Sequence, residues 1–396
     1  MLGSFKANFI SSYGGWAGEA FDFQLFALAL PLILATQSLT PAMAGLAVTG
    51  GLVAAAIGGS AGGALSDRIG RLSVLQGAIM VTALATLGFA VAVAPWQFVV
   101  LKAIQGLAFG AEWSVGAVLI AERASAGRRG RYLGLMQSAW AIGWGAAVLT
   151  AYVASSLFDP AVAWRIMFAA GVAPVGLVLW LRLQPRQEQP RKARPSRLAP
   201  QDWAAMKRRV LPSALLGLAA HGGFHSLFTW VPTLLRTERG FSVGQSTLIL
   251  LTMTAAFGLG CIAAGVASDR FGRRTILSLF AALSATTAFT TTLLPLTPVT
   301  AVAAAVPLGF AAGGVPAILG CWFAELFPAP VRGLGVGFAY NAGRIGSAAL
   351  PGLIGWAMGL APLGVLIGMT ALICYGGAAL VAQRLPETRS LEMVAP

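Results

Sequence analysis

Long apolar runs, each bounded by short polar or charged segments, fill almost the whole of this chain of 396 residues. An apolar helix of about 20 residues crosses the hydrocarbon core of a bilayer. Unbroken runs of that length argue against a membrane barrel, whose strands alternate over about ten residues. The pattern therefore predicts an all-α integral membrane protein. The twelve predicted transmembrane spans are 15–37, 42–65, 73–94, 97–122, 131–156, 163–183, 211–235, 243–267, 275–294, 299–324, 333–357 and 362–383.

The sequence repeats itself at an offset of about half its length. The segment Gly63-Ala-Leu-Ser-Asp67-Arg68-Ile-Gly70-Arg71 recurs as Gly265-Val-Ala-Ser-Asp269-Arg270-Phe-Gly272-Arg273, and Glu122-x6-Arg129-Gly130 recurs as Glu325-x6-Arg332-Gly333. Internal duplication of this kind is common in secondary transporters. We expect two pseudo-symmetric bundles of six helices, formed by residues 1–183 and 211–396 and joined by a basic cytoplasmic linker over residues 184–210.

Composition excludes a soluble globule, because 57% of the residues are apolar, 10% are charged and the mean hydropathy is +0.78. Most Lys and Arg residues, which give the net charge of +14, lie in the N-terminus, the even-numbered loops and the C-terminus. The positive-inside rule then places both termini in the cytoplasm. We expect a multi-pass protein of the inner (plasma) membrane, whose linker attracts anionic lipid of the bilayer rather than nucleic acid. The sequence offers no metal-ligand cluster, nucleotide-binding loop or nucleophile and base set, so we do not expect an enzyme.

The repeated Gly-Asp-Arg segment suggests a gate. Its Gly lets two helices approach closely, and its Asp can accept hydrogen bonds from a neighbouring helix end. The pattern Gly-x3-Asp-Arg-x-Gly-Arg, placed between the second and third spans of each half, resembles the signature of the major facilitator superfamily. This resemblance implies a cytoplasmic latch that is closed in the outward-open state. The gating residues expected from the two repeats are Asp67, Arg68, Arg71, Asp269, Arg270, Arg273, Glu122, Arg129, Glu325 and Arg332.

Few ionisable groups lie inside the predicted spans, where a buried charge costs on the order of 3 kcal/mol unless it is paired or solvated. Several follow helical spacing with other polar or aromatic residues, as in Tyr340, Arg344 and Ser347, so that they share one face of a helix. Such a stripe is typical of a cavity lining. These candidates for function are Glu19, Asp22, Lys102, Glu112, His221, His225 and Arg344.

The duplication helps to separate function from architecture among these groups. A shift of 203 residues pairs Asp22 with His225, whereas Glu112 and Arg344 correspond to the apolar residues Val315 and Ala141. Glu112 and Arg344 are therefore additions to the shared template. Structural alternatives stay open: Arg344 as half of an ion pair, the histidines as hydrogen-bonded core residues, and Glu19 as a side chain that reaches the inner surface.

A narrower resemblance covers nearly the whole chain. Glu19-Ala-Phe-Asp22 resembles the Asp-x-Phe-Asp motif in the first span of proton-coupled organic-acid symporters, the sialate, metabolite (carboxylate) and aromatic-acid group. Lys102-x2-Gln105-Gly106-x3-Gly110-Ala-Glu112-Trp113 resembles their fourth-span pattern, with Lys102 in the place of Arg. Tyr340-Asn341-x2-Arg344 and Leu385-Pro386-Glu387-Thr388 also match. Lys lacks the planar fork that grips a carboxylate with two bonds.

The chemistry of the residues agrees with that group. A cation at mid-depth can bind an anionic substrate, and Arg344 offers one, with Tyr340, Asn341, Gln137, His221 and His225 as further candidates for binding. Lys102 could attract the anion from outside. Burial raises the proton affinity of a carboxylate, so Asp22, Glu112 and Glu19 are the candidates for proton coupling.

The resulting hypothesis is import of a small organic acid by proton-coupled symport and alternating access, by a functional monomer with no cofactor beyond the coupling proton. Two alternatives remain. A proton-driven exporter of drugs or metabolites shares the spans and the gate. A neutral-solute porter of the sugar type would use polar and aromatic side chains, which here could be Trp16, Gln105, Trp113, Gln137 and Trp140.

Overall fold

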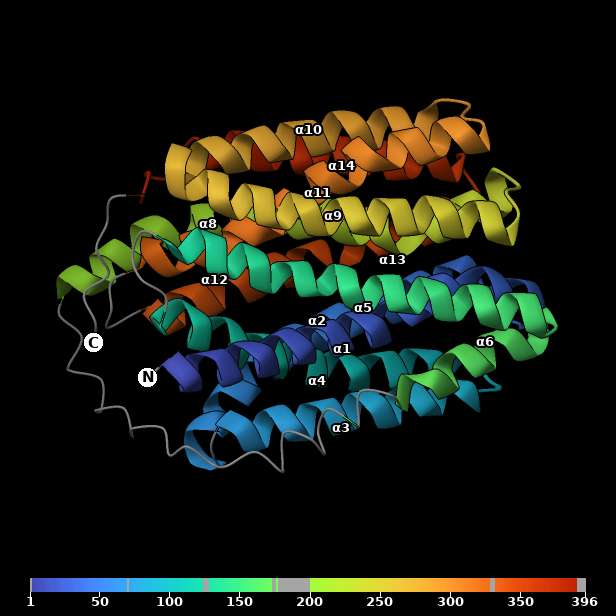
Figure 1. Cartoon of the computed structure of the whole chain (residues 1–396), viewed down its shortest axis with the longest axis horizontal. Helices are drawn as coiled ribbons and strands as arrows, with labels where there is room; N and C mark the ends of the chain where they lie inside the picture. Colours follow the sequence, from blue (N-terminus) through green and yellow to red (C-terminus); the bar gives the residue numbers. More distant parts are fainter. Residues whose placement is uncertain are drawn as a thin grey trace.

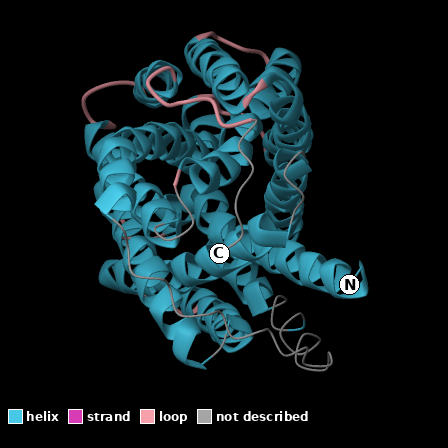
Figure 2. Ribbon diagram, turned by 90° about the vertical axis from the view of Figure 1, so that its left-hand side faces the viewer, coloured by secondary structure: helices cyan, strands magenta, loops and turns pink. Residues whose placement is uncertain are grey.

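The computed structural model describes residues 2–69, 71–123, 128–172, 176, 200–327 and 332–389 and contains no strand within them. Helices run side by side along one direction (Figure 1), and a view of one end shows them as a bundle (Figure 2). The all-α expectation is confirmed. The helices are α1 (Leu2–Thr36), α2 (Pro41–Ile69), α3 (Arg71–Ala90), α4 (Pro95–Arg123), α5 (Arg129–Leu157), α6 (Pro160–Ala169), η2 (Ala170–Val172), α8 (Pro200–Thr233), η3 (Leu234–Glu238), α9 (Val243–Phe271), α10 (Arg273–Leu293), α11 (Pro298–Leu326), α12 (Arg332–Ser347), α13 (Ala349–Ala357) and α14 (Leu363–Ala382).

Each predicted span matches a helix or a pair of consecutive helices. Seven helices in the described part of the chain are long and apolar enough to cross a membrane. Two helices begin well before their predicted spans: α1 begins at Leu2 rather than at residue 15, and α8 begins at Pro200 although its apolar run begins at residue 211. The first turns of α8 are polar and project beyond the other helices (Figure 1), because a helix can continue outside the bilayer where hydropathy no longer marks it. The predicted linker therefore includes the start of α8, and residues 184–199 of it lie outside the described residues.

The eleventh predicted span is broken into α12 and α13 around Ala348. Pro351 lacks the N–H that would continue the helical hydrogen bonding at this point. The carbonyl of Ala348 accepts a hydrogen bond of 2.6 Å from Oγ1 of Thr49, which lies on α2 in the other half of the sequence. The break thus lies one turn from Arg344 and is bound to the opposite half.

Within each half, a glycine lets two helices pack closely, and the two glycines occupy equivalent positions of the repeat. A Cβ added to Gly106 of α4 would lie 2.0 Å from the carbonyl oxygen of Gly51 on α2. Its repeat partner, Gly309 of α11, would meet the carbonyl oxygen of Met253 on α9 at 2.1 Å. Such approach of backbones drives helix association in lipid, where the hydrophobic effect contributes little. The same internal contact occurs in both copies.

The two halves meet chiefly where α2 packs against α12 and α13 and where α5 packs against α9 and α11. Gly45 lies against Gly352 at one end, and Gly130 lies against Gly265 at the other. Between these ends α1, α4, α8 and α12 contact one another through Phe23, Phe109, His225 and Arg344.

Candidate functional site

A cluster of aromatic rings fills the centre between the halves; we call it the aromatic box, formed by Trp16, Phe23, Phe109, Trp140 and Phe224. Phe23 and Phe109 stack with ring centroids 5.1 Å apart, and Trp16 stacks on Phe109 at 5.9 Å. Trp140 of α5 meets Phe224 of α8 edge-on at 5.9 Å. The box therefore joins α1, α4 and α5 of the first half to α8 of the second, and it offers flat apolar faces.

Arg344 of α12 lies at the wall of the aromatic box and is 2% exposed. Its guanidinium carbon is 4.7 Å from the centre of the Phe109 ring and 4.9 Å from that of Tyr340. Nη2 donates a long hydrogen bond of 3.4 Å to Oη of Tyr340, one helical turn away. Nε is buried and has no hydrogen-bond partner among the described residues. Among the described residues Arg344 contacts two aromatic rings and a hydroxyl group.

Two histidines of α8 lie next to this cation. His221 meets the Tyr340 ring edge-on at 4.4 Å and stacks with His225 at 5.8 Å. The ring of His225 is 6.0 Å from that of Phe23. Nε2 of His221 and both ring nitrogens of His225 are buried without a hydrogen-bond partner in the described residues. The alternative of hydrogen-bonded core residues therefore does not describe His225.

Lys102 of α4 lies inside the first half, not near the outer surface where an attracting role would place it. Its Nζ donates to Oε1 of Gln105 at 2.7 Å and more weakly to the carbonyl of Phe23 at 3.4 Å, and it lies 4.2 Å above the Phe23 ring. The side chain is 2% exposed. This ammonium is used within the bundle, so the geometry does not favour it as a ligand for an incoming anion.

Gln105 connects Lys102 to the neighbouring helices. Its Nε2 donates to the backbone carbonyl of Asp22 at 3.3 Å and to Oγ1 of Thr86 at 3.0 Å. The hydroxyl of Thr86 in turn donates to the carbonyl of Thr82. Because both amide protons are used, the amide presents its oxygen to Lys102 in a fixed orientation.

The two carboxylates of α1 are buried. Asp22 is 1% exposed, interacts electrostatically with Lys102, and lies so near η2 that a Cβ on Gly171 would be 2.9 Å from its Oδ1. Glu19 is 4% exposed and is electrostatically coupled to Tyr340 of the other half. Glu19 therefore does not reach the inner surface. Asp22 belongs to the interior of the first half, and Glu19 is nearer the central site.

Other candidates are placed only in part. Gln137 and Asn341 are half-buried, and the structure gives no hydrogen bond between either side chain and Arg344 among the described residues. Glu112 lies on α4, one turn after Phe109, but its side chain is outside the described residues. The same holds for the side chains of four gating candidates in the first half, Asp67, Arg68, Arg71 and Glu122, and of Arg332 in the second half.

The second copy of the gate motif forms a charge cluster at the predicted cytoplasmic end. Oδ1 and Oδ2 of Asp269 accept hydrogen bonds from the backbone N–H groups of Gly130 and Arg131, at 3.0 and 2.9 Å. Those groups begin α5, so a carboxylate of the second half caps a helix of the first, where the helix dipole favours it. This contact holds the two halves together at that end.

Arg273 completes the cluster. It binds Asp269 at 2.6 Å and grips both oxygens of Glu325 at 3.1 and 3.0 Å. Oγ1 of Thr388 donates to the same carboxylate at 2.6 Å. Arg129, at the start of α5, is buried with Nε and Nη1 unpartnered among the described residues, and Arg270 lies over the ring of Phe271 at 5.2 Å.

Glu387 caps the helix that carries Arg273. Its oxygens accept from the backbone N–H groups of Arg273 and Arg274 at 2.9 and 3.0 Å, and also from those of Thr388 and Arg389. Partial burial opposes ionisation, but these four donors together hold the pKa of Glu387 below its usual value of 4.5. The Leu-Pro-Glu-Thr motif thus fastens the end of the chain to the gate cluster.

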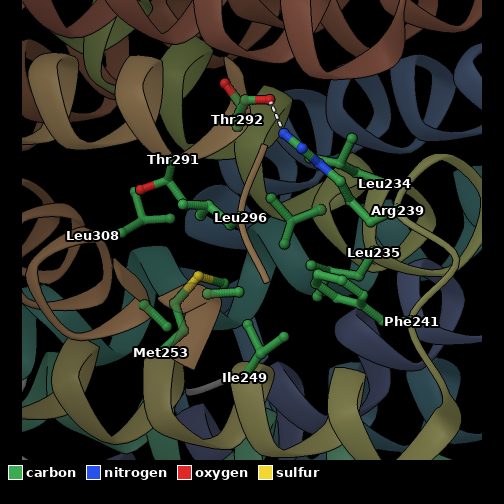
Figure 3. Close-up of a pocket in the computed structure, with 13 residues that line it drawn as sticks. Leu234, Leu235, Arg239, Phe241, Ile249, Met253, Thr291, Thr292, Leu296 and Leu308 are labelled. Carbon is green, nitrogen blue, oxygen red and sulfur yellow. Dashed lines mark hydrogen bonds between the residues drawn. The ribbon is translucent and has the colours of Figure 1, made fainter. Parts of the chain in front are cut away.

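A separate cavity lies within the second half, between η3, α9, α10 and α11 (Figure 3). Its walls are mainly aliphatic, including Leu235, Ile249 and Met253. Its one charged lining residue, Arg239, donates to the carbonyl of Thr292 at 2.6 Å. The cavity has no set of unused donors, so the central cluster is the better candidate for a binding site.

The sequence suggests Arg344 and the histidines as candidates for binding, and in the structure Arg344 and His221 both lie at Tyr340, but the sequence predicts no role for Phe23 or Phe109. The sequence does place both rings near candidate residues, since Phe23 follows Asp22 and Phe109 lies two helical turns after Lys102. Which rings of two different helices stack on each other cannot be deduced from the sequence of either helix alone.

The fold, the duplicated gate and the buried central site define a secondary transporter, and comparison with known proteins agrees. The family model described as Major Facilitator Superfamily matches residues 15–351. The chain belongs to this superfamily, and it is therefore a multi-pass integral membrane transporter and not an enzyme.

The relatives with curated names are transporters of small organic molecules. The chain is 34% identical over 397 residues to the probable 4-methylmuconolactone transporter of Cupriavidus pinatubonensis, covering 98% of this chain and 91% of the relative. It is 27% identical over 393 residues to the cis,cis-muconate transport protein of Acinetobacter baylyi, covering 94% and 92%. It is 27% identical over 386 residues to the niacin transporter NiaP of the same species, covering 88% and 87%.

Solved structures share the architecture. The proton:xylose symporter XylE matches with a TM-score of 0.76 and 17% identity, over 97% of this chain and 96% of that chain. The human organic anion transporter MFSD10 (TETRAN) matches with a TM-score of 0.71 and 15% identity, over 96% and 99%. At these identities the likeness shows the fold alone.

Proposed function

We propose that this protein imports a small, planar organic acid together with protons by alternating access. Arg344 binds the carboxylate of the substrate, the aromatic box packs against its flat face, and buried acids of the first half carry the coupling proton. The membrane is the inner membrane, both termini are cytoplasmic, and the monomer is the functional unit.

The observation that carries the proposal is the set of unused donors around Arg344. Nε of Arg344 and the indole N–H groups of Trp16 and Trp140 are buried without hydrogen-bond partners in the described residues, as are the ring nitrogens of His225. Leaving such groups unpaired costs about 1–3 kcal/mol each. A carboxylate, which is a strong acceptor, would satisfy the guanidinium with charge-assisted bonds.

The shape of the site supports a planar substrate. Phe109 lies beside Arg344, and Phe23 and Trp16 stack on Phe109, so an unsaturated or aromatic acid could stack on these rings while its carboxylate meets the guanidinium. The relatives described above are named as transporters of a muconolactone, of muconate and of niacin. These are small unsaturated acids or a lactone, and the chemistry of this site suits the same class.

Proton coupling is proposed for Asp22, Glu19 and Glu112. Asp22 shares its surroundings with Lys102, so a proton gained by Asp22 changes the net charge of a buried pair. Glu19 lies nearer Tyr340 and Arg344, so its proton is more directly linked to binding of an anion. Glu112 enters on its position along α4 alone.

Gating is proposed to alternate between the two ends. The Asp269 cluster closes the end that the charge distribution assigns to the cytoplasm, and the Thr49 to Ala348 hydrogen bond joins the halves on the other side of Arg344. Opening to the cytoplasm requires Asp269 to leave the start of α5.

A binding experiment separates an acid transporter from a neutral-solute porter. Purified protein is titrated with nicotinate and cis,cis-muconate, and in parallel with nicotinamide, dimethyl muconate and xylose, while thermal unfolding is followed. Stabilisation by the acids and not by the neutral compounds is expected. Equal or stronger stabilisation by the neutral compounds would refute the assignment of Arg344 as a carboxylate ligand. Transport assays in both membrane orientations separate import from export.

A further inference from the structure

Arg344 presents a charge problem for the empty protein. A guanidinium buried at mid-membrane is unfavourable unless something compensates its charge. When substrate is bound, the substrate carboxylate can do so. An importer must also return without substrate, and it passes through a closed state on the way. In the structure this centre is closed, since Arg344 is 2% exposed.

Two rings cover the guanidinium in this closed state, and they differ in origin. Tyr340 lies on α12, four residues before Arg344, so it accompanies Arg344 in every conformation. Phe109 lies on α4 of the other half, with its centroid 4.7 Å from the guanidinium carbon. The contact between Phe109 and Arg344 therefore exists only when the two halves have closed around the centre.

Phe109 is held firmly on its own side. Its ring stacks with Trp16 and Phe23 and meets Trp140 edge-on at 6.1 Å. The next residue, Gly110, packs so tightly on α2 that an added Cβ would lie 1.7 Å from the carbonyl oxygen of Ala55. The Phe109 face is therefore a fixed part of the first half and closes onto Arg344 as a preformed surface.

From this geometry we infer that Phe109 stands in for the substrate in the empty carrier: its ring face covers the Arg344 guanidinium and lets the unloaded protein close and reorient. This inference rests on the proposed function, since it concerns the same site. A planar acid would displace the contact and offer a carboxylate in its place. Phe109 is thus the residue that permits net transport, whereas exchange of one substrate for another does not require the empty closed state.

Other ionisable groups lie near Phe109 and Phe23. Glu19 lies four residues before Phe23 on α1, and Glu112 lies three residues after Phe109 on α4. Asp22 directly precedes Phe23, and Lys102 and His225 lie beside the Phe23 ring. If one of the acids alone compensated Arg344 in the empty state, loss of the Phe109 ring would leave closure unaffected. The experiment below distinguishes these cases.

Distances between spin labels test the inference without any substrate. One pair of cysteines for labelling replaces the exposed residues Trp96 and Leu360 at one end of the protein. A second pair replaces the exposed residues Ile69 on α2 and Phe338 on α12, toward the other end. The native Cys261, Cys321 and Cys374 are buried. In the empty protein, Phe109→Leu should reduce the closed population about fivefold or more, since a desolvated cation–π contact is lost. Phe109→Trp should preserve it, and Phe89→Leu, another buried Phe of the first half, is the control.

Flux measurements give the second readout. In proteoliposomes, Phe109→Leu should lower net uptake of labelled cis,cis-muconate about fivefold more than it lowers exchange of labelled for unlabelled muconate, because exchange does not pass through the empty closed state. Unchanged distance distributions in empty Phe109→Leu would overturn the inference, whatever the transport result. Absence of acid transport by the wild-type protein would instead refute the proposed function, which is a different outcome.

Discussion

Lys102 and Arg344 each lie over one ring of the stacked pair Phe23 and Phe109, Lys102 from the first half and Arg344 from the second. The two cations do different work in this arrangement. Lys102 is bonded to Gln105 within its own bundle, whereas Arg344 keeps a buried donor unused. Lys102 therefore has a structural role in the first half, whereas Arg344 is available to bind the substrate.

Arg344 is expected to determine affinity for acids. Arg344→Ala removes a charge-assisted contact, so nicotinate or cis,cis-muconate should bind about a hundredfold more weakly, or about 3 kcal/mol. Arg344→Lys keeps the charge but loses the fork and should weaken binding about tenfold. Thermal-shift or calorimetric titration measures both. Unchanged affinity in a folded Arg344→Ala protein would remove Arg344 from the binding site.

Lys102 is expected to stabilise the first half through Asp22. Lys102→Met leaves Asp22 buried without its coupled cation, and the free energy of unfolding should fall by about 3 kcal/mol. Asp22→Asn in the same protein should recover part of this loss, because neither charge then remains. A double-mutant cycle from unfolding in detergent gives the coupling energy. Additive effects of the two substitutions would show that Asp22 and Lys102 act independently.

The role of Lys102 illustrates the limit of sequence reasoning here. Its position near the start of a span suggested a cation that meets the substrate outside. The structure places it beneath Phe23 because Gln105, one turn along, is locked by Thr86 and offers an acceptor there. Position along a helix follows from the sequence, but the face that a neighbouring helix covers does not.

Close helix packing at Gly309 is expected to be essential. Gly309→Ala would place a methyl group 2.1 Å from the carbonyl oxygen of Met253 and separate α9 from α11. Overpacking of this kind costs about 1–3 kcal/mol. Gly320→Ala, on the same helix with no heavy atom within 4 Å of the added group, is the matched control and should be neutral or slightly stabilising. Equal unfolding temperatures for the two variants would contradict the packing.

Glu387 is expected to make stability depend on acid pH. Its pKa is lowered in the folded protein, so its contribution is present above its usual value of 4.5 and is lost as the pH falls through the folded value. Glu387→Gln should therefore lower the unfolding temperature at about pH 6, and the difference from wild type should shrink toward about pH 3. The corresponding replacement Asp159→Asn, of a carboxylate whose side chain caps no helix, is the control. A difference that stays constant with pH would exclude this capping role.

The spans, the duplication and the buried ionisable groups could all be predicted, because hydropathy, repeats and the cost of burying charge are properties of the chain itself. Asp22 and His225 occupy equivalent positions in the two copies, yet Asp22 lies near Gly171 and Thr86 while His225 lies beside Phe23. The sequence identifies the pair, but contacts between the halves decide what each residue touches.

Proton-driven uptake tests the central claim most directly. Protein reconstituted in a known orientation is given labelled nicotinate or cis,cis-muconate under an imposed inward proton gradient. We expect accumulation of at least one acid that a protonophore abolishes, and loss of gradient dependence in Asp22→Asn. Uptake of these acids that ignores the gradient, or gradient-driven accumulation only in the opposite direction, would contradict proton-coupled import.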